Sequence, residues 1–223
     1  MDGRYIRNIP ALTEQECALL RTKKAAVIGC GGLGGHIIEL LTRVGIGSIV
    51  CVDGDVFEES NLNRQLLSET ALLGTAKAEA AADRVRRINP DVVVKAVHAY
   101  LEEENAAELI AGCDVVLDAL DSIPARRILA KACADAGIPC VYGAIGGWVA
   151  QAAVSMPGDN LIEILYPEGA VIKDKSVLSF TPALCASMQT ALCVKLLAGR
   201  SVDAGTMYYF DLLNQEFETI PLV

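Results

Sequence analysis

Short apolar runs of strand length alternate with helical patterns along the first two thirds of the chain. The runs predict strands at 24–28, 48–52, 92–97, 115–119 and 139–143. Five helices are predicted between and before these strands. The first covers 13–23, where Thr13 and Glu16 have the spacing of a capping box, and the second runs from the glycines after residue 28 to Val44. The others cover 75–88, with Thr75 as the cap, 102–111 and 124–136. Continuously apolar strands separated by amphipathic helices indicate a parallel sheet covered on both faces.

The pattern becomes mixed from Trp148 onward. Strands are predicted at 149–155, 161–165, 206–211 and 216–220, with one helix at 182–197. Because strand follows strand here, we expect antiparallel additions to the edge of the same sheet rather than a second domain. The predicted fold is therefore α/β, a Rossmann-like, mostly parallel sheet with helices on both faces and antiparallel C-terminal strands, in a single domain over residues 1–223.

Charge and composition restrict the partners. Lys and Arg number 19 against 28 Asp and Glu, which gives a net charge of −9 and argues against binding to nucleic acid or to an anionic membrane. The most apolar stretch, 183–198, carries Gln189 and Lys195, so no membrane span is predicted, and the first residues do not resemble a secretory signal. Eight cysteines without a Cys-x-x-Cys pair favour a reducing compartment, and we expect a cytoplasmic protein.

A glycine-rich segment joins the first strand to the next helix. Gly29, Gly31 and Gly34 fit the pattern G-x-G-x-x-G, and Asp53 ends the following strand. Glycines admit phosphate close to the backbone, a helix N-terminus at Leu33 offers free N–H groups, and Asp53 can accept hydrogen bonds from ribose hydroxyls. The segment predicts a nucleotide site, although it does not distinguish NAD from ATP and could serve only tight packing of helix on sheet.

Cationic residues outside this segment favour a triphosphate. Arg64 lies in N-L-N-R-Q after the second strand, Lys77 in the first turn of the next helix, and Arg7 in R-Y-x-R near the start of the chain. Substitution at phosphorus needs Arg and Lys to neutralise charge that spreads over the reacting phosphates. Asp121 follows another strand and supplies a carboxylate suited to Mg²⁺.

Taken in order, G-x-G-G-L-G, D-x-D, N-L-N-R-Q, G-x-x-K and D-x-x-D, preceded by R-Y-x-R, resemble the ThiF, MoeB, HesA and ubiquitin-activating enzyme family. The resemblance runs from Arg4 to the C-terminal strands. It implies an adenylyltransferase that uses MgATP to adenylate the C-terminal Gly-Gly carboxylate of a ubiquitin-like sulfur-carrier protein, releasing pyrophosphate, in thiamine, molybdopterin or related sulfur-transfer biosynthesis. It also implies a homodimer.

The same resemblance assigns roles to residues. It places Asp53 on the ribose, Asp121 on the magnesium ion, and Arg7 on the phosphates, often from the partner subunit. Asp55 joins the nucleotide-binding candidates, although it could also only cap a turn. The candidates around the phosphates are Gly29, Gly31, Gly32, Leu33, Gly34, Asn61, Arg64 and Lys77, of which Arg64 and Lys77, with Arg7 and Asp121, are the catalytic candidates.

Two features of many family members are missing from the sequence. No paired Cys-x-x-Cys motifs occur, so no zinc is expected, and the segment 167–181, where the family often has a long crossover loop, is short and has no cysteine. Cys185 is the nearest cysteine beyond it, and its place at the start of an apolar helix favours a buried structural thiol over a reactive one.

Two alternative functions stay open. An NAD(P)-dependent oxidoreductase would use the same glycine segment but leaves the cations unexplained. A non-catalytic subunit that binds a carrier protein is the other; Arg64, Lys77 and Asp121 argue against it, because an idle site has no need of them.

Overall fold

The computed structural model describes residues 3–172 and 176–222, so part of the segment 167–181 lies outside it. In chain order its 3-10 helices (η), α-helices and strands are η1 Gly3–Asn8, α1 Glu14–Leu20, β1 Lys24–Ile28, α2 Gly32–Val44, β2 Ser48–Val52, η2 Glu59–Asn61, η3 Thr70–Leu72, α3 Lys77–Ile88, β3 Val93–Val97, α4 Ala106–Leu109, β4 Val115–Asp118, α5 Ile123–Ala136, β5 Cys140–Gly146, β6 Val149–Ser155, α6 Leu161–Leu165, α7 Phe180–Leu197, β7 Thr206–Asp211 and β8 Glu216–Pro221.

The eight strands of the described residues form one sheet, in the order β3-β2-β1-β4-β5-β6-β7-β8. The pairs from β3 to β5 are parallel, and those from β5 to β8 are antiparallel. The chain first builds outward from β1 to β3 and then returns to place β4 on the other side of β1. This reversal opens a crevice at the carboxyl ends of β1 and β4, where α/β sheets bind ligands. The predicted fold class is confirmed.

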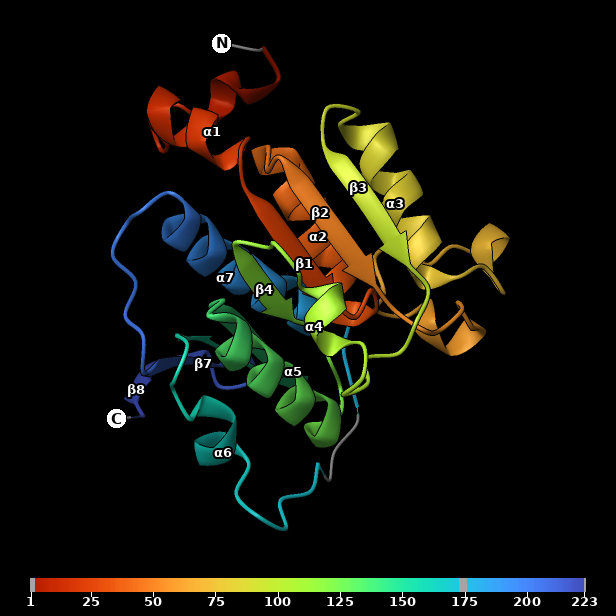
Figure 1. Cartoon of the computed structure of the whole chain (residues 1–223). Coiled ribbons are helices and arrows are strands. Elements are labelled where there is room, and N and C mark those ends of the chain that lie inside the picture. Colours follow the sequence, from red (N-terminus) through yellow and green to blue (C-terminus); the bar gives the residue numbers. More distant parts are fainter. Residues whose placement is uncertain (1–2, 173–175, 223) are drawn as a thin grey trace.

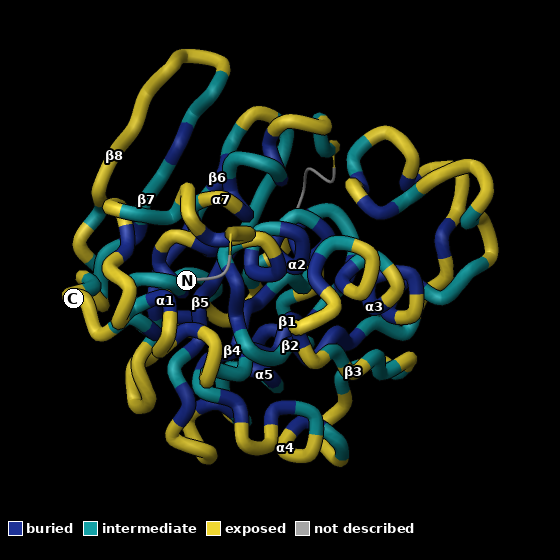
Figure 2. Tube along the Cα trace, turned by 90° about the horizontal axis from the view of Figure 1, so that it is seen from above, coloured by how far each residue is buried: buried dark blue, intermediate teal, exposed yellow. Residues whose placement is uncertain are grey.

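Helices cover both faces of the sheet (Figures 1 and 2). One face packs against α2, α3 and α7, and there Val27, Ile49 and Leu117 join Ile37 in a buried cluster. Residues next to them in the strands point to the other face, where Leu129 of α5 belongs to a second cluster. Alternate strand residues are therefore buried on opposite sides, which explains why these strands are apolar throughout.

Helix α7, which carries Cys185 and Cys193, packs on the same face of the sheet as α2 and α3. It is long and apolar enough to cross a membrane by length and composition alone, but half of that window is buried inside the protein. Gln189 at its centre is fully buried and donates to the carbonyls of Asp118 and Val141, at 2.9 and 3.1 Å. These contacts assign α7 to the interior of the fold.

Three predicted elements differ from the structure. The segment 161–165 was predicted as a strand but is helix α6, in which Leu161 and Ile162 are both buried in a cluster with Tyr142. Helix α3 begins at Lys77 rather than after Thr75, whose carbonyl accepts from the amide of Phe57. The helix predicted at 102–111 is reduced to α4, Ala106–Leu109.

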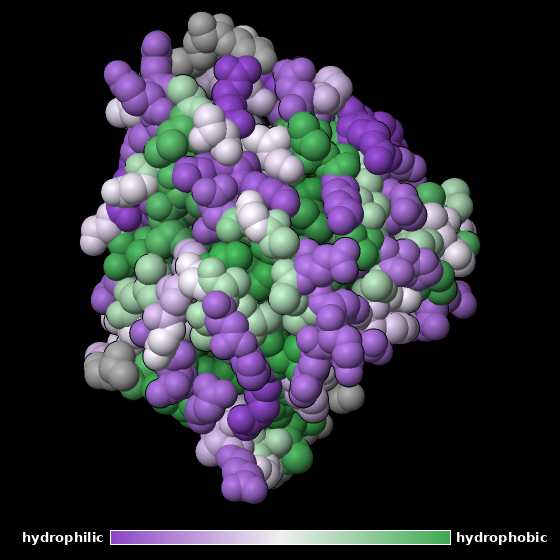
Figure 3. All heavy atoms as spheres, viewed as in Figure 1, coloured by the Kyte–Doolittle hydropathy of each residue, from purple (hydrophilic) through white to green (hydrophobic). Residues whose placement is uncertain are grey.

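Other boundaries agree closely with the predictions, and the capping box of Thr13 and Glu16 is confirmed at the start of α1. The surface seen in Figure 3 is a mosaic of hydrophilic and hydrophobic residues. The hairpin of β7 and β8 projects from the body in Figure 2, and β8 is its exposed edge strand.

Candidate nucleotide-binding site

A cavity of about 830 Å³ opens at the carboxyl ends of the parallel strands. It brings together most of the residues singled out from the sequence, although they come from five separate segments of the chain. Those on its wall are Gly29, Gly31, Gly32, Leu33, Asp53, Asp55, Arg64, Lys77 and Asp121. The volume is within the range of small-molecule sites, which is about 300–1,000 Å³.

The glycine segment forms the floor where β1 passes into α2. Gly29 has a φ of +99°, and a Cβ there would lie 2.6 Å from the carbonyl oxygen of Ala119, so only glycine fits. Gly34 lies off the wall and packs so closely that a Cβ would meet the oxygen of Gly29 at 1.8 Å. Gly31 is the N-cap of α2 and has no side chain to bond the first turn. The amide groups of that turn are therefore available to an anion.

Asp53 is fixed by the backbone around it. Its carboxylate accepts from the amides of Cys30 and Asp55, at 2.7 and 2.8 Å. Burial raises the pKa of Asp53, while these two hydrogen bonds oppose the shift. A carboxylate held in one orientation at the end of β2 can accept from vicinal hydroxyls of a ribose, as the sequence predicts.

Asp55 joins two polar side chains on the wall. The Lys77 ammonium lies 3.0 Å from Oδ2 of Asp55, and the Tyr100 hydroxyl donates to Oδ1 at 2.7 Å. These partners lower the pKa of Asp55, Tyr100 contributing most. Asp55 therefore does more than cap a turn, because it holds the cation that faces the cavity.

The segment after β2 divides into structural and site residues. Asn61 lies off the wall and is buried, and its side-chain oxygen accepts from the amide of Glu58 in a capping box of η2. Arg64 reaches the wall with its guanidinium on the carbonyl of Ser60 and the side-chain oxygen of Asn63, at 2.8 and 2.9 Å. Asn61 thus shapes the turn that presents Arg64.

Gln65 is a wall residue to which the sequence argument gave no role. Its side chain is buried beside Gly31, and its Oε1 has no hydrogen-bond partner among the described residues. Its position in the motif N-L-N-R-Q was the one feature of the sequence that could have identified it as a site residue.

Asp121 is exposed at the rim of the cavity, one residue before the N-cap Ser122 of α5. No ion pair or hydrogen bond ties up its carboxylate within residues 3–172 and 176–222. The same part of the chain holds no group of three His, Cys, Asp or Glu side chains placed around a metal ion. Asp121 suits a Mg²⁺ ion that takes its other ligands from phosphate and water.

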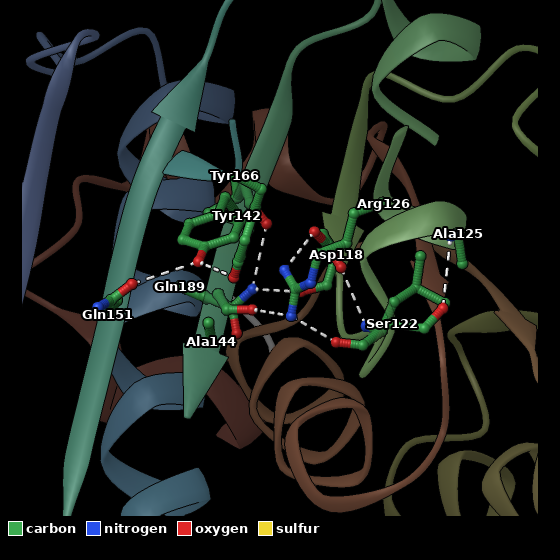
Figure 4. A network of polar contacts seen from close by, with 12 residues as sticks. Asp118, Ser122, Ala125, Arg126, Tyr142, Ala144, Gln151, Tyr166 and Gln189 are labelled. Carbon is green, nitrogen blue, oxygen red and sulfur yellow. Dashed lines mark hydrogen bonds and ion pairs between the residues drawn. The ribbon is translucent and has the colours of Figure 1, made fainter. Parts of the chain in front are cut away.

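Arg126 lines the cavity and belongs to a buried polar network that includes Asp118 and Tyr142 (Figure 4). Arg126 pairs with Asp118 at 2.7 Å, donates to the carbonyls of Leu120 and Gly143, and has its guanidinium 4.9 Å from the ring centre of Tyr142. The pair is almost entirely buried, with side-chain exposures of 3% and 2%. The network fixes β4, β5 and α5 relative to one another. The network is not evident from the sequence, because a lone arginine in a helix carries no sign of burial.

Cys185 stands apart from the cavity wall. Burial raises its pKa to about 12, and its thiol lies 3.2 Å from the carbonyl oxygen of Gln151. A thiol with that pKa is almost wholly protonated near neutral pH. The geometry supports the structural interpretation of Cys185.

Arg7 is not brought to the cavity of its own chain. It lies exposed in η1, and the neighbouring Asn8 donates to the carbonyl of Val44 at the far end of α2. Helix α2 is about 20 Å long and begins at the glycine segment. Because η1 contacts the far end of α2, it lies at the amino ends of the parallel strands, away from the glycine segment. Figure 1 shows η1 and α1 at this end of the strands, away from the arrowheads.

Comparison with known proteins places the chain among nucleotide-dependent enzymes. The ThiF family matches residues 4–222. The SAMP-activating enzyme E1 of Haloferax volcanii is 39% identical over 91% of this chain and 77% of its own, and the sulfur carrier protein adenylyltransferase of Thermus thermophilus is 32% identical over 97% and 86%. The mouse adenylyltransferase and sulfurtransferase MOCS3 is 34% identical over 98% of this chain. The chain spans 50% of the length of that protein.

A solved structure of Escherichia coli MccB with ATP has the same fold. It superposes with a TM-score of 0.85 at 19% identity, covering 100% of this chain and 72% of that chain.

Proposed function

The chain belongs to the ThiF family, and from that premise we propose that it adenylates the C-terminal glycine carboxylate of a ubiquitin-like sulfur-carrier protein with ATP. One observation carries the proposal. A single cavity joins a glycine-lined helix N-terminus to the cations Arg64 and Lys77 and to the exposed carboxylate of Asp121. The names of the relatives in Haloferax volcanii and Thermus thermophilus support the reaction and the kind of partner.

The reaction needs charge neutralisation more than acid–base catalysis. A carboxylate oxygen of the carrier attacks the α-phosphorus, the bond to the bridging oxygen of the β-phosphate breaks, and pyrophosphate leaves with its electron pair. Both reactants are anions, so Arg64 and Lys77 must offset the charge that builds on the phosphates. In-line placement of the two groups supplies much of the remaining rate.

ATP fits the residues that line the cavity. The free amides at the start of α2 suit the phosphates, and the oriented carboxylate of Asp53 suits the ribose. Asp121 would hold Mg²⁺, which when bound neutralises phosphate charge. The apolar side of the wall, which includes Ile145, Val149 and Val177, leaves room for an extended glycine tail.

A homodimer would complete the site. Arg7 lies about 20 Å from the cavity of its own chain, so we propose that Arg7 of the partner subunit reaches the phosphates. We also propose that the protein acts in the cytoplasm, in a sulfur-transfer pathway such as thiamine or molybdopterin synthesis. The tail of its carrier protein would end in Gly-Gly.

Ligand-dependent melting distinguishes the nucleotides. A ligand that binds only the folded state raises stability by about 2.7 kcal/mol at a hundred times its Kd. We expect MgATP to raise the melting temperature of the wild-type chain, NAD⁺ and NADP⁺ to leave it unchanged, and Asp121→Ala to reduce the MgATP effect. Asp135→Ala, which removes an exposed carboxylate on α5, is the matched control. Stabilisation by a dinucleotide instead would favour the oxidoreductase alternative.

Exchange of labelled pyrophosphate into ATP tests the reaction itself. Exchange should require a carrier with a free C-terminal Gly-Gly and should stop when the terminal glycine is removed. Binding of MgATP and of a carrier without any exchange would instead favour a non-catalytic carrier-binding subunit.

A further inference from the structure

Tyr100 is a cavity residue with no role in the proposed reaction so far. It follows β3, lines the cavity, and is 64% exposed. An exposed tyrosine hydroxyl ordinarily bonds to water, but this one donates to Oδ1 of Asp55 at 2.7 Å. A side chain with this exposure and this contact is placed to affect the site rather than the core.

Asp55 connects Tyr100 to Lys77. Its Oδ2 accepts from the Lys77 ammonium at 3.0 Å, so the two donors occupy the two oxygens of one carboxylate. The Asp55 side chain is 52% exposed, whereas that of Lys77 is 8% exposed. A half-exposed carboxylate can rotate about its side-chain bonds, and a second donor on the other oxygen restricts that rotation. The position of the buried ammonium therefore depends on the tyrosine hydroxyl.

Tyr100 is itself held from two sides. Its ring packs on the backbone of Gly54, where an added Cβ would lie 2.6 Å from ring carbons, and its carbonyl accepts from the Asn105 side chain at 2.9 Å. His98, two residues earlier, contacts the carbonyl oxygen of Gly54 at 2.9 Å. The end of β3 is thus fastened to the turn that carries Asp55.

We propose that Tyr100 is a positioning residue for adenylation, which through Asp55 holds the Lys77 ammonium at the phosphate end of the cavity. The inference rests on the proposed function, in which Lys77 contacts the triphosphate. Lys77 needs such a support because its ammonium is a point charge on a flexible stem, unlike the planar fork of an arginine. The hydroxyl of Tyr100 is also the main cause of the lowered pKa of Asp55, as expected for a direct hydrogen bond to that carboxylate.

Removal of the hydroxyl alone tests the inference. Tyr100→Phe keeps the ring on Gly54, and its binding of MgATP and of AMP is measured by calorimetry on the full chain. AMP lacks the β- and γ-phosphates. We expect about a tenfold loss of MgATP affinity, the size of one hydrogen bond to a charged group, with AMP affinity unchanged. Equal losses for the two nucleotides would overturn the inference, because they would show that Tyr100 contacts the nucleoside or only stabilises the fold.

A double-mutant cycle with Asp55→Ala tests the route through Asp55. Tyr100→Phe should cost no further MgATP affinity in that background, because the carboxylate it acts through is already gone. A full additional loss would overturn the inference. Tyr209→Phe removes a tyrosine hydroxyl on β7 outside the cavity and should leave both affinities unchanged.

The two proposals fail in different ways. A folded wild-type chain that binds neither nucleotide would overturn the proposed function and this inference together. Wild-type MgATP binding that Tyr100→Phe leaves intact would overturn the inference alone.

Discussion

Lys77 and Asp55 form an ion pair of 3.0 Å in which the lysine is the buried member and the carboxylate the half-exposed one. Both side chains line the cavity, so the pair lies where a ligand can compete for the ammonium. A phosphate that enters can share the ammonium with Asp55, and the lysine then needs no large movement to bind it.

Substitution of Lys77 should abolish most of the activity without unfolding the protein. Lys77→Met keeps the apolar stem that is buried in the first turn of α3 and removes the charge. Loss of one preorganised charge-stabilising donor costs about 10²–10³ in rate. We expect a loss of this size in pyrophosphate exchange, with normal exchange in Lys131→Met, which removes an exposed lysine of α5. Near wild-type exchange in Lys77→Met would show that the ammonium is not needed.

Loss of Arg64 should lower the rate more than the affinity for ATP. Its guanidinium is held by Ser60 and Asn63 and, within the described residues, makes no hydrogen bond to the glycine segment or Asp53. We therefore expect it to act on charge that develops during the reaction. Arg64→Ala should reduce the maximal exchange rate about 100-fold and change the Kd for MgATP only a few-fold. Equal effects on the two quantities would mean that Arg64 binds ground-state ATP. Arg86→Ala, on the exposed side of α3, is the control.

Disruption of the buried Asp118–Arg126 pair should destabilise the fold. Arg126→Met leaves the Asp118 carboxylate buried without its cation, which typically costs about 3–5 kcal/mol. Urea unfolding monitored by circular dichroism measures this loss of free energy. Arg86→Met breaks an exposed pair and should cost less than about 1 kcal/mol. A loss for Arg126→Met as small as that of the control would contradict the structural role of the network.

Glu16 should make stability dependent on acid pH. Hydrogen bonds from Arg200 hold its pKa at about 2, against 4.5 for an unperturbed glutamate. A group whose pKa is lowered on folding stabilises the native state above its unfolded value, so this contribution is present above about pH 4.5 and is lost as the pH falls toward 2.

Comparison with Glu16→Gln measures that contribution. The difference in unfolding free energy between wild type and variant should be constant from pH 7 to about pH 5 and should shrink below it. A difference that does not change with pH would show that Glu16 acts by packing and capping alone.

Arg7 offers a test of the proposed dimeric site. Arg7→Ala and Lys77→Met should each be inactive alone, and a mixture of the two should regain activity. In a heterodimer one of the two sites has both wild-type residues, so random exchange of subunits restores about a quarter of wild-type activity. Activity of Arg7→Ala alone would place Arg7 outside the reaction, and no recovery after proven subunit exchange would contradict a site shared between the two subunits.

The sheet was predictable because its strands carry a strong local signal. Parallel strands buried on both faces are apolar at every position, and 24–28 and 48–52 agree with β1 and β2 to the residue. The segment 161–165 gives no such signal, because four apolar residues around Glu163 fit a short strand as well as one turn of helix. Its packing beneath Tyr142 decides the outcome, and this contact is set by the tertiary fold.

The site was predictable where a motif determines backbone geometry. The glycine segment and Asp53 are examples, since their backbone geometry and their place on the cavity wall follow from the β-α-β unit itself. Tyr100 and Arg126 were not identifiable, because their importance depends on which segments the fold brings beside them. Neither residue has a distinctive neighbour in the sequence.

The position of α7 has a consequence for the order in which the protein can fold during synthesis. Its fully buried Gln189 bonds to the carbonyls of Asp118, at the end of β4, and Val141, near the start of β5. A nascent chain that has left the ribosome only as far as β5 already holds every residue of the glycine segment, but the face of its sheet that carries α2 and α3 still lacks α7. The nucleotide pocket is therefore completed late in translation, and a truncated product would keep the motif and lack the site.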